Sequence, residues 1–284
     1  MTDEVFGLSA GHLHSSFSDF LRATRPDLLP RGDVTAVPEL TFATTILSLR
    51  YSDGVVIAGD RRATAGYTIE HRDIEKVFPT DSHSAAAISG VAGPSMEMVR
   101  LFQTELEYYE KVEGEPLSLT GRANHLGRLI RANLPAAMQG FVVLPLYAGF
   151  DLRTGQGRIF RYDVTGGLYE ETDFHATGSG GKDARNTLKR LFRSAEEIDR
   201  DGAVRIALEA LADAAEEDVG TAGPDPVHSI YPTVFVIDAD GVREVPQSEV
   251  ETIAQAVLDE RREAFRRRAG TTRPVQGEHE GGNT

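Results

Sequence analysis

Runs of hydrophobic residues separated by turn residues dominate the chain directly after residue 43. TTILSLRY and VVIAGD flank the turn residues Asp53 and Gly54, which predicts a β-hairpin over residues 44–60. Shorter runs with β-branched or small residues predict three further strands, at 67–71, 76–78 and 84–89. This part of the chain is therefore expected to form sheet.

Helical spacing begins at Pro94, where apolar residues recur every three or four positions as far as Gly114. The pattern along the rest of the chain predicts a helix at about 119–139, strands at 141–152 and 157–164, helices at about 182–194 and 202–217, a hairpin at 230–245 and a helix at about 247–268. Hairpin strands pair antiparallel, and helices that arrive in pairs form layers. The order predicts an α+β fold, a four-layer αββα sandwich of two mainly antiparallel sheets between helix layers.

The two ends of the chain differ from this pattern. Residues 1–43 hold only short amphipathic pieces and the Pro- and Gly-punctuated stretch RPDLLPRGDVTAVPEL, which is typical of a leader or linker. Residues 271–284 form a polar tail that is expected to be disordered. One domain is predicted between them, over residues 44–270.

Composition narrows the classes of function. The net charge of −14 argues against a general nucleic-acid binder, and no apolar run reaches the roughly 18 residues of a membrane-spanning helix. The acidic start of the chain does not read as a secretory signal, and the absence of cysteine excludes disulfides and thiolate chemistry. We therefore expect a cytoplasmic protein with neither a nucleic-acid nor a membrane partner. The basic cluster at residues 261–268 is interpreted as a solvated helix end.

The sequence does not match the common catalytic motifs. ATGSGGKD lacks the glycine and the hydroxyl residue that a Walker A loop needs, and Gly178-Ser179-Gly180 lacks the spacing of a nucleophile elbow. The eight histidines show no metal-ligand spacing, so neither a zinc site nor a cofactor is expected. None of the histidines is a plausible catalytic base, so a Ser-His-Asp triad has no support in the local sequence.

A threonine at a free amino terminus can supply its own base, and Thr44 follows the small residue Ala43. The α-amine, with a pKa of about 7.7–8.0, accepts the hydroxyl proton. Such a site needs a cation, a carboxylate that orients the cation, and N–H donors for an oxyanion. Lys76, Asp60 and the turn SGVAG are candidates, although each also has an ordinary structural interpretation.

At these spacings, TTILSLRYSDGVVIAGDRRAT, RDIEKVF, ISGVAG, YAGFD, ATGSG and EDVGTAGPD resemble the proteasome β-subunit family of N-terminal-nucleophile hydrolases, of the actinobacterial type. The resemblance spans residue 44 to about 257 and implies this superfamily's fold. It implies Thr44 as a nucleophile freed by self-cleavage after Ala43, with Asp60 and Lys76 tuning it. The resemblance also implies that Ser179 and Asp218 support the Thr44 amine through hydrogen bonds, with Thr221 at a position where the family usually has serine. It implies the backbone N–H of Gly90 as the donor to the oxyanion.

The resemblance also implies a specificity pocket and partners. The residues at the pocket positions are all apolar and uncharged: Ala63, Ile74, Ile88, Ala92 and Met96. Cleavage after hydrophobic residues is therefore expected. The implied partners are seven-membered β rings stacked with α-subunit rings, an ATPase ring regulator, and tagged or unfolded protein substrates.

Ala43 departs from the family pattern, which places glycine before the nucleophile. Alanine adopts positive φ at a higher cost than glycine, so Ala43 favours slower self-cleavage or an uncut chain. The active form is nevertheless the expectation, because all five residues to which the resemblance assigns catalytic roles are present: Thr44, Asp60, Lys76, Ser179 and Asp218.

Ala43 keeps open the alternative of a catalytically silent assembly subunit left uncut. Two further alternatives have the same type of site. One is the simpler two-ring bacterial threonine protease, which is much shorter and usually has GDGQ where this chain has GDRR; the other is a small-molecule amidohydrolase of the same superfamily, which a threonine site alone does not exclude.

Overall fold

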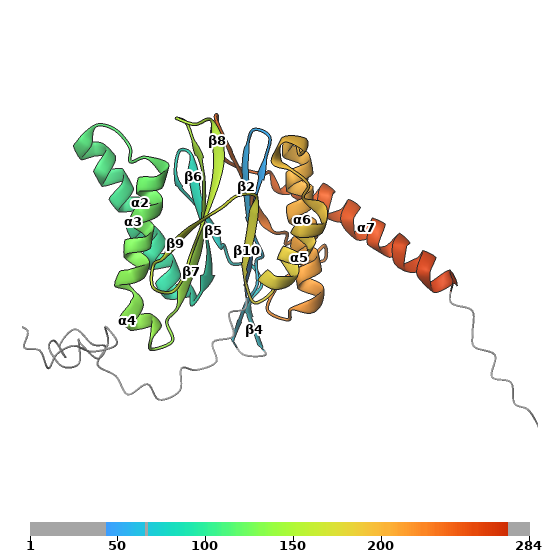
Figure 1. The fold of residues 1–284 in the computed structure, drawn as a ribbon. Coiled ribbons are helices and arrows are strands. Elements are labelled where there is room, and N and C mark those ends of the chain that lie inside the picture. The colour runs from blue at the N-terminus through green and yellow to red at the C-terminus, as the bar shows by residue number, and fades with distance from the viewer. Residues whose placement is uncertain (1–43, 66–67, 272–284) are drawn as a thin grey trace, which may run out of the picture.

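The expected hairpin is present and forms the middle of a five-stranded sheet. The computed structural model describes residues 44–65 and 68–271 (Figure 1). The first sheet has the order β10-β1-β2-β11-β12, and every pair of neighbours is antiparallel. Its strands are β1 (Thr45–Tyr51), β2 (Gly54–Gly59), β10 (Phe174–Gly178), β11 (Thr233–Asp238) and β12 (Gly241–Glu244).

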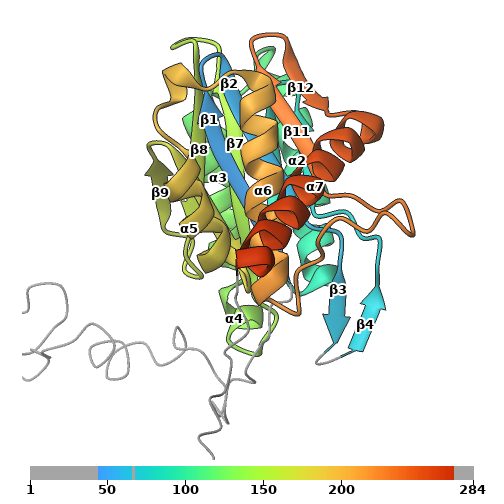
Figure 2. The same ribbon diagram turned by 90° about the vertical axis from the view of Figure 1, so that its right-hand side faces the viewer.

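A second antiparallel sheet of five strands packs against the first, in the sequential order β5-β6-β7-β8-β9. Its strands are β5 (Val77–Asp81), β6 (Ser84–Gly90), β7 (Val143–Asp151), β8 (Gln156–Tyr162) and β9 (Leu168–Glu171). A separate short hairpin of β3 (Ala63–Ala65) and β4 (Thr68–His71) projects from one end of the sandwich (Figure 2). This hairpin connects the strand that ends near Asp60 to the strand that follows Lys76.

Helices cover both outer faces of the sheets, which confirms the αββα prediction (Figure 1). The second sheet is covered by α2 (Ala92–Glu113) and α3 (Leu119–Ala132), with the short α4 (Leu134–Ala137) at one end. The first sheet is covered by α5 (Gly181–Leu191) and α6 (Arg200–Glu217), which a 3-10 turn at Ala195–Glu197 connects. The last helix, α7 (Gln247–Thr271), packs on α6 and then extends away from the body.

Three hydrophobic layers hold the sandwich together, one between the sheets and one under each pair of helices. Because both faces of each sheet are covered, the central strands are buried at almost every position and read as unbroken apolar runs. Between the sheets the side chains include Ile46, Ile57, Leu146, Ile159 and Ile237. This apolar layer fixes the positions of β1 and β2, and with them Thr44 at the start of β1 and Asp60 at the end of β2.

Several sequence predictions need correction. The single helix expected over 119–139 is two helices, because Pro135 lacks a backbone N–H and the chain turns at Asn133 before α4 begins. The helix expected from Pro94 starts at Ala92, with the proline in its first turn, where proline is tolerated. Strands β3, β9 and β10 were not predicted. The expected leader and Tyr67 lie outside the described residues, as does the expected tail apart from Thr271, the last residue of α7.

Candidate active site

Thr44 lies at the start of β1, between the two strands that carry its expected partners. β1 pairs with β2 on one side and with β10 on the other, with Ile46 opposite Gly59 and Thr45 opposite Gly178. Asp60 directly follows β2, and Ser179 directly follows β10. The antiparallel register therefore brings Asp60, 16 positions away in the sequence, to one side of Thr44 and Ser179, 135 positions away, to the other.

Asp60 and Lys76 form a buried ion pair beneath this point. Lys76 Nζ donates to Asp60 Oδ1 at 2.7 Å, and the side chains are 7% and 0% exposed. The same Asp60 oxygen accepts the backbone N–H of Thr45 at 2.8 Å. Asp60 Oδ2 accepts two more backbone N–H groups, from Arg62 at 2.9 Å and from Ala222 at 3.0 Å. The carboxylate thus joins the residue after Thr44 to the lysine and to the loop after α6.

The ammonium of Lys76 is held by the chain on two sides. Besides Asp60, Nζ donates to the backbone carbonyl of Arg62 in a short hydrogen bond. Burial lowers the pKa of Lys76 below its usual value, and the neighbouring Asp60 carboxylate offsets part of that shift. A partly desolvated cation in the lining of the same cavity as Thr44 can favour the neutral form of an amine close to it through charge repulsion.

A chain of hydroxyl groups on the other flank ends at Asp218. The backbone N–H of Thr44 donates to Ser179 Oγ at 3.2 Å, and Ser179 Oγ donates to Asp218 Oδ2 at 2.5 Å. Thr221 Oγ1 donates to the same carboxylate oxygen at 2.5 Å and lies 2.6 Å from Thr45 Oγ1. Since the Thr221 proton is already used, Thr45 is the donor in that last pair. Ser179, Asp218 and Thr221 are therefore all connected to the backbone or side chains of residues 44–45.

Gly178 allows β10 to approach Thr44 closely. Its φ is +101°, and a Cβ at this position would lie 1.9 Å from the Thr44 carbonyl oxygen. The carbonyl instead accepts the backbone N–H of Ser179 at 2.9 Å. Any larger residue at 178 would push Ser179 away from Thr44.

A cavity of about 530 Å³ opens beside Thr44, within the size range of ligand sites. The five residues predicted for the specificity pocket all line it: Ala63, Ile74, Ile88, Ala92 and Met96. Lys76 and Gly90 line it as well. The structure therefore brings every predicted pocket residue together with Thr44 around one space.

The N-terminus of α2 faces this cavity. Gly90 ends β6 at a φ of +142°, and a Cβ there would lie 2.2 Å from the Val142 carbonyl oxygen, so the backbone conformation requires glycine. Val91 is the N-cap residue of α2, and Val91, Ala92 and Gly93 all line the cavity. Backbone N–H groups and the positive end of the helix dipole therefore lie at this cavity, an arrangement that can stabilise a negative charge.

Sequence reasoning missed part of the cavity lining. The missed residues are Thr64, Glu70, His71, Glu75, Phe78 and Ser95, whereas Val91 and Gly93 belong to the predicted turn SGVAG. Ser95 was accessible to prediction, because it lies three residues after Ala92 and therefore on the same face of the helix. Glu70 and His71 were not, because they belong to the projecting β3–β4 hairpin, whose position no sequence pattern indicates.

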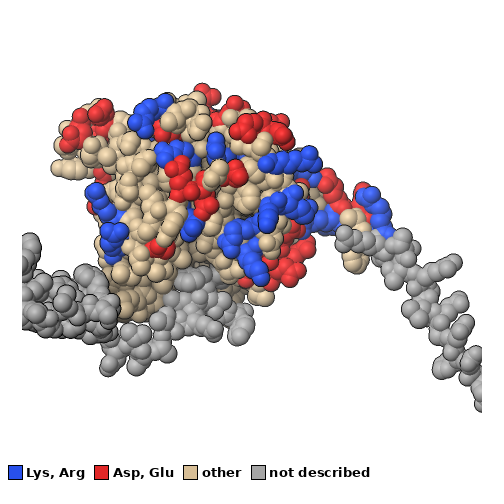
Figure 3. Space-filling view, in the orientation of Figure 1, with Lys and Arg blue, Asp and Glu red and all other residues tan. Residues whose placement is uncertain are grey.

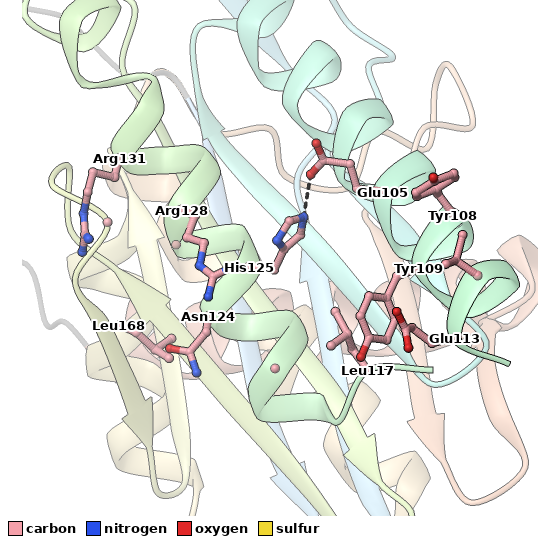
Figure 4. Close-up of a pocket in the computed structure, with 14 residues that line it drawn as sticks. Glu105, Tyr108, Tyr109, Glu113, Leu117, Asn124, His125, Arg128, Arg131 and Leu168 are labelled. Carbon is pink, nitrogen blue, oxygen red and sulfur yellow. Dashed lines mark hydrogen bonds and ion pairs between the residues drawn. The ribbon is translucent and has the colours of Figure 1, made fainter. Parts of the chain in front are cut away.

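A second cavity, of about 640 Å³, lies between α2 and α3, and none of the predicted site residues line it (Figure 4). Tyr108, Tyr109 and Leu117 line it together with Arg128, and His125 Nε2 lies 2.5 Å from Glu105 Oε2 across it. Its larger volume does not make it the better candidate, because the residues predicted for the site, including Thr44 and Lys76, line the cavity at the other end of α2.

Neither the surface charge nor the potential metal ligands of the described residues point to a second functional site. On the face in Figure 3, acidic and basic side chains are interspersed, and on α7 Arg261 pairs with Asp213 and Glu216. Within residues 44–65 and 68–271, no group of three potential ligand side chains is arranged to hold a metal ion. Over the same ranges, no helix combines the length and the apolar character needed to cross a bilayer.

Comparison with known proteins supplies independent information. Residues 41–227 match the family described as proteasome subunit. A proteasome subunit beta of Acidothermus cellulolyticus is 52% identical over 252 residues, which cover 86% of each chain. The proteasome subunit beta of Acidimicrobium ferrooxidans is 54% identical over 78% of this chain and 81% of its own, and that of Stackebrandtia nassauensis is 50% identical over 88% and 91%.

Proposed function

This chain belongs to the proteasome subunit family, among its β-type members, and we propose that it is a catalytic subunit whose nucleophile is Thr44. In this proposal it is a threonine endopeptidase of a proteasome core that degrades unfolded proteins to peptides. The observation that carries the proposal is the position of the buried Lys76–Asp60 pair, which binds the Thr45 N–H beneath the cavity that Thr44 lines.

We propose that the active form begins at Thr44, after self-cleavage of the Ala43–Thr44 bond. The Thr44 hydroxyl then attacks the substrate carbonyl, and its own amine accepts the proton and later gives it to the leaving amine. Water then hydrolyses the ester left on the Thr44 oxygen, which releases the second product as a carboxylic acid and restores the hydroxyl. The nitrogen that becomes this amine already lies 3.2 Å from Ser179 Oγ, which Asp218 orients in turn. These two residues are assigned the role of holding the amine in place.

The charged groups have separate roles in this mechanism. Lys76 disfavours protonation of the amine at neutral pH and stabilises negative charge that develops on the Thr44 oxygen, while Asp60 keeps the ammonium in position. The Gly90 N–H, at the N-terminus of α2, donates to the oxyanion of the tetrahedral intermediate. The apolar wall of the cavity receives the side chain before the cleaved bond, which supports a preference for hydrophobic residues there.

The proposal includes an assembly. The relatives are named as proteasome β subunits, which supports incorporation of this chain into a proteasome core with other subunits. We propose homo-heptameric β rings stacked with α-subunit rings, regulated by an ATPase ring and supplied with tagged or unfolded proteins in the cytoplasm.

The silent assembly subunit is the second candidate, and Ala43 in place of glycine is what favours it. Hydrolysis of fluorogenic peptides by the chain co-assembled with its α-type partner separates the two. Peptides with a hydrophobic residue before the reporter are expected to be cleaved, and those with an acidic residue much more slowly. Thr44→Ala, in particles of the same size, is expected to abolish cleavage. Full activity of that variant would refute the assignment of Thr44.

A further inference from the structure

Arg62 is hydrogen-bonded to both halves of the candidate site through three of its groups. Its backbone N–H donates to Asp60 Oδ2 at 2.9 Å, and its carbonyl accepts the short hydrogen bond from Lys76 Nζ. Its guanidinium Nη1 donates to the backbone carbonyls of Val219 at 3.1 Å and Thr221 at 3.3 Å. The proposed mechanism gives this guanidinium no role.

The segment that the guanidinium holds is the turn at residues 218–221, directly after α6. Asp218 is the C-cap residue of that helix, and its carbonyl accepts the Thr221 N–H at 3.1 Å. The Asp218 carboxylate accepts the Gly220 N–H at 3.1 Å and the hydroxyl groups of Thr221 and Ser179, both at 2.5 Å. The turn therefore fixes the carboxylate oxygen that orients Ser179.

Hydrogen bonds connect this turn to the chain around Asp60. The Ala222 N–H donates to Asp60 Oδ2 at 3.0 Å, and Arg62 contributes the two bonds from its guanidinium, across 157 and 159 residues of sequence. Because Thr221 is 0% exposed, loss of the guanidinium takes a donor from a carbonyl in a buried residue. The position of the turn relative to β2 therefore depends in part on Arg62.

We propose that the Arg62 guanidinium is a positioning group that holds the turn at 218–221 against the chain around Lys76, and so fixes the spacing of the two groups that act on the Thr44 amine. One is the Ser179 hydroxyl, which Asp218 orients. The other is the Lys76 ammonium, which donates to the carbonyl of Arg62 itself. The inference rests on the proposed function, because it takes this amine to be the base.

The expected effect is on kcat rather than on KM. Arg62 is not among the described residues that line the cavity beside Thr44, so a change of its side chain should leave peptide binding intact. A displacement of about 1 Å between catalytic groups can lower a rate by about 100-fold. A substitution that loosens the turn should therefore lower kcat and kcat/KM by the same factor.

The charge of Arg62 can be separated from its geometry. Burial lowers the pKa of Lys76 most, the carboxylates of Asp60 and Asp218 raise it, and the Arg62 cation lowers it further. Arg62→Lys keeps this positive charge but replaces the planar guanidinium by a flexible ammonium, whereas Arg62→Met keeps neither.

The test measures hydrolysis of a peptide with a hydrophobic residue before the reporter by the full chain, co-assembled with its α-type partner. Intact mass gives the fraction of chains that begin at Thr44, and kcat is expressed per such chain, so incomplete self-cleavage does not count as slower hydrolysis. Arg62→Met is expected to lower kcat by about 100-fold and to change KM by less than about twofold. Arg62→Lys is expected to recover about tenfold of that loss, because an ammonium can still donate to a carbonyl.

Arg50→Met is the matched control. Arg50 Nη1 likewise donates to a backbone carbonyl, that of Thr172 at 3.0 Å, and Arg50 is outside the described lining of the cavity. It lies near the end of β1 that is opposite Thr44. Its kcat and KM should equal those of the unaltered chain.

A loss of kcat in Arg62→Met that Arg62→Lys partly restores, with KM unchanged in both, supports the proposal. A kcat for Arg62→Met within about twofold of the unaltered value overturns it, and so does a rise in KM that accounts for the whole loss. An equal loss in Arg50→Met also overturns it, because the effect would then not be specific to the turn at 218–221.

If Arg62→Met forms no particles, or no chain that begins at Thr44, Arg62→Lys decides. A kcat about tenfold below that of the unaltered chain at the same KM supports the proposal, and an unchanged kcat overturns it. If the unaltered chain cleaves no peptide, the proposed function itself fails, which differs from equal cleavage by the unaltered chain and Arg62→Met.

Discussion

Lys76 Nζ lies 2.7 Å from Asp60 Oδ1, and that same oxygen accepts the backbone N–H of the residue that follows Thr44. One buried carboxylate oxygen is therefore shared between the cation and the chain that carries the candidate nucleophile. A displacement of Lys76 alters the partners of this oxygen, and a displacement of β1 does the same. The ion pair thus couples the position of Thr44 to the charge beside it.

Replacing this cation by an uncharged side chain of similar length tests the coupling. Lys76→Met is expected to lower kcat/KM for a hydrophobic peptide by at least about 100-fold, because the amine then loses the charge that keeps it neutral. The free energy of unfolding is expected to fall by about 3–5 kcal/mol, since Asp60 stays buried without its ion-pair partner. Peptide hydrolysis and urea denaturation measure the two effects.

Lys111→Met is the matched control for that experiment. Lys111 pairs with Glu107 on the exposed surface of α2, and pairs of this kind contribute little to stability. Its activity should match that of the unaltered chain. A Lys76→Met variant that retains more than about a third of the activity would contradict the role given to the buried cation.

The backbone at Gly90 offers a second test. Gly90→Ala is expected to cost about 2–3 kcal/mol of stability and to impair hydrolysis, because a Cβ there meets the Val142 carbonyl oxygen at a positive φ. Gly155→Ala controls for φ alone, since Gly155 has a φ of +67° and open space around its Cβ position. It should cost less stability and leave peptide cleavage intact. Equal effects of the two substitutions on cleavage would argue against Gly90 as the oxyanion donor.

The charge of the cavity wall should determine substrate choice. Met96→Lys places an ammonium among the apolar lining residues, so peptides with an acidic residue before the cleaved bond should gain and hydrophobic ones should lose. The ratio of their kcat/KM values is expected to shift toward the acidic peptide by about tenfold or more. Leu101→Lys, exposed on the same helix and outside this cavity, should leave the ratio unchanged. An unshifted ratio in Met96→Lys would remove Met96 from the specificity pocket.

Acid sensitivity should arise in part at His175 on β10. The pKa of this imidazole is lowered to about 4, chiefly by burial; Glu171 opposes the shift, while Arg185 and Arg161 add to it. The unfolded chain therefore binds a proton between pH 6.5 and 4 that the folded chain does not, so stability falls as the pH drops through that window. The loss is on the order of 2–3 kcal/mol.

His175→Gln removes this titrating group. The urea midpoint of the variant should change less between pH 6.5 and pH 4 than that of the unaltered chain. An identical acid dependence in the two proteins would assign the sensitivity to other groups.

Most of the helices and strands of the layered fold can be predicted from the sequence, because turn residues, apolar runs and prolines within each segment indicate them. The turn at Asp53–Gly54 and the apolar runs around it specify a hairpin, and Pro94 marks the first turn of α2. The missed strands β3, β9 and β10 have only three to five residues and partly exposed side chains, so their pairing depends on the rest of the sheet rather than on their own pattern. Pro135 marks the break between α3 and α4 in the sequence, whereas the apolar periodicity continues across it and predicts a single helix.

The residues of the candidate site also differ in how well the sequence alone identifies them. Thr44, Asp60 and Lys76 lie within one short segment, where spacing and family resemblance together identify them. The link from Thr45 to Thr221 and Asp218 crosses 176 residues of sequence and depends on the tertiary register of β1, β10 and the loop after α6. The hydrogen bonds of the Arg62 guanidinium depend on side-chain packing, which no spacing rule predicts.

The amino-terminal residue of the chain purified from the assembled particle is the most direct test of the central claim. Amino-terminal sequencing together with intact mass should find a chain that begins at Thr44 and lacks residues 1–43, although Ala43 rather than glycine precedes the cleaved bond. A chain that keeps residues 1–43 after assembly, and still hydrolyses peptides, would contradict Thr44 as an amino-terminal nucleophile. A chain that keeps them and hydrolyses nothing would instead be the silent assembly subunit.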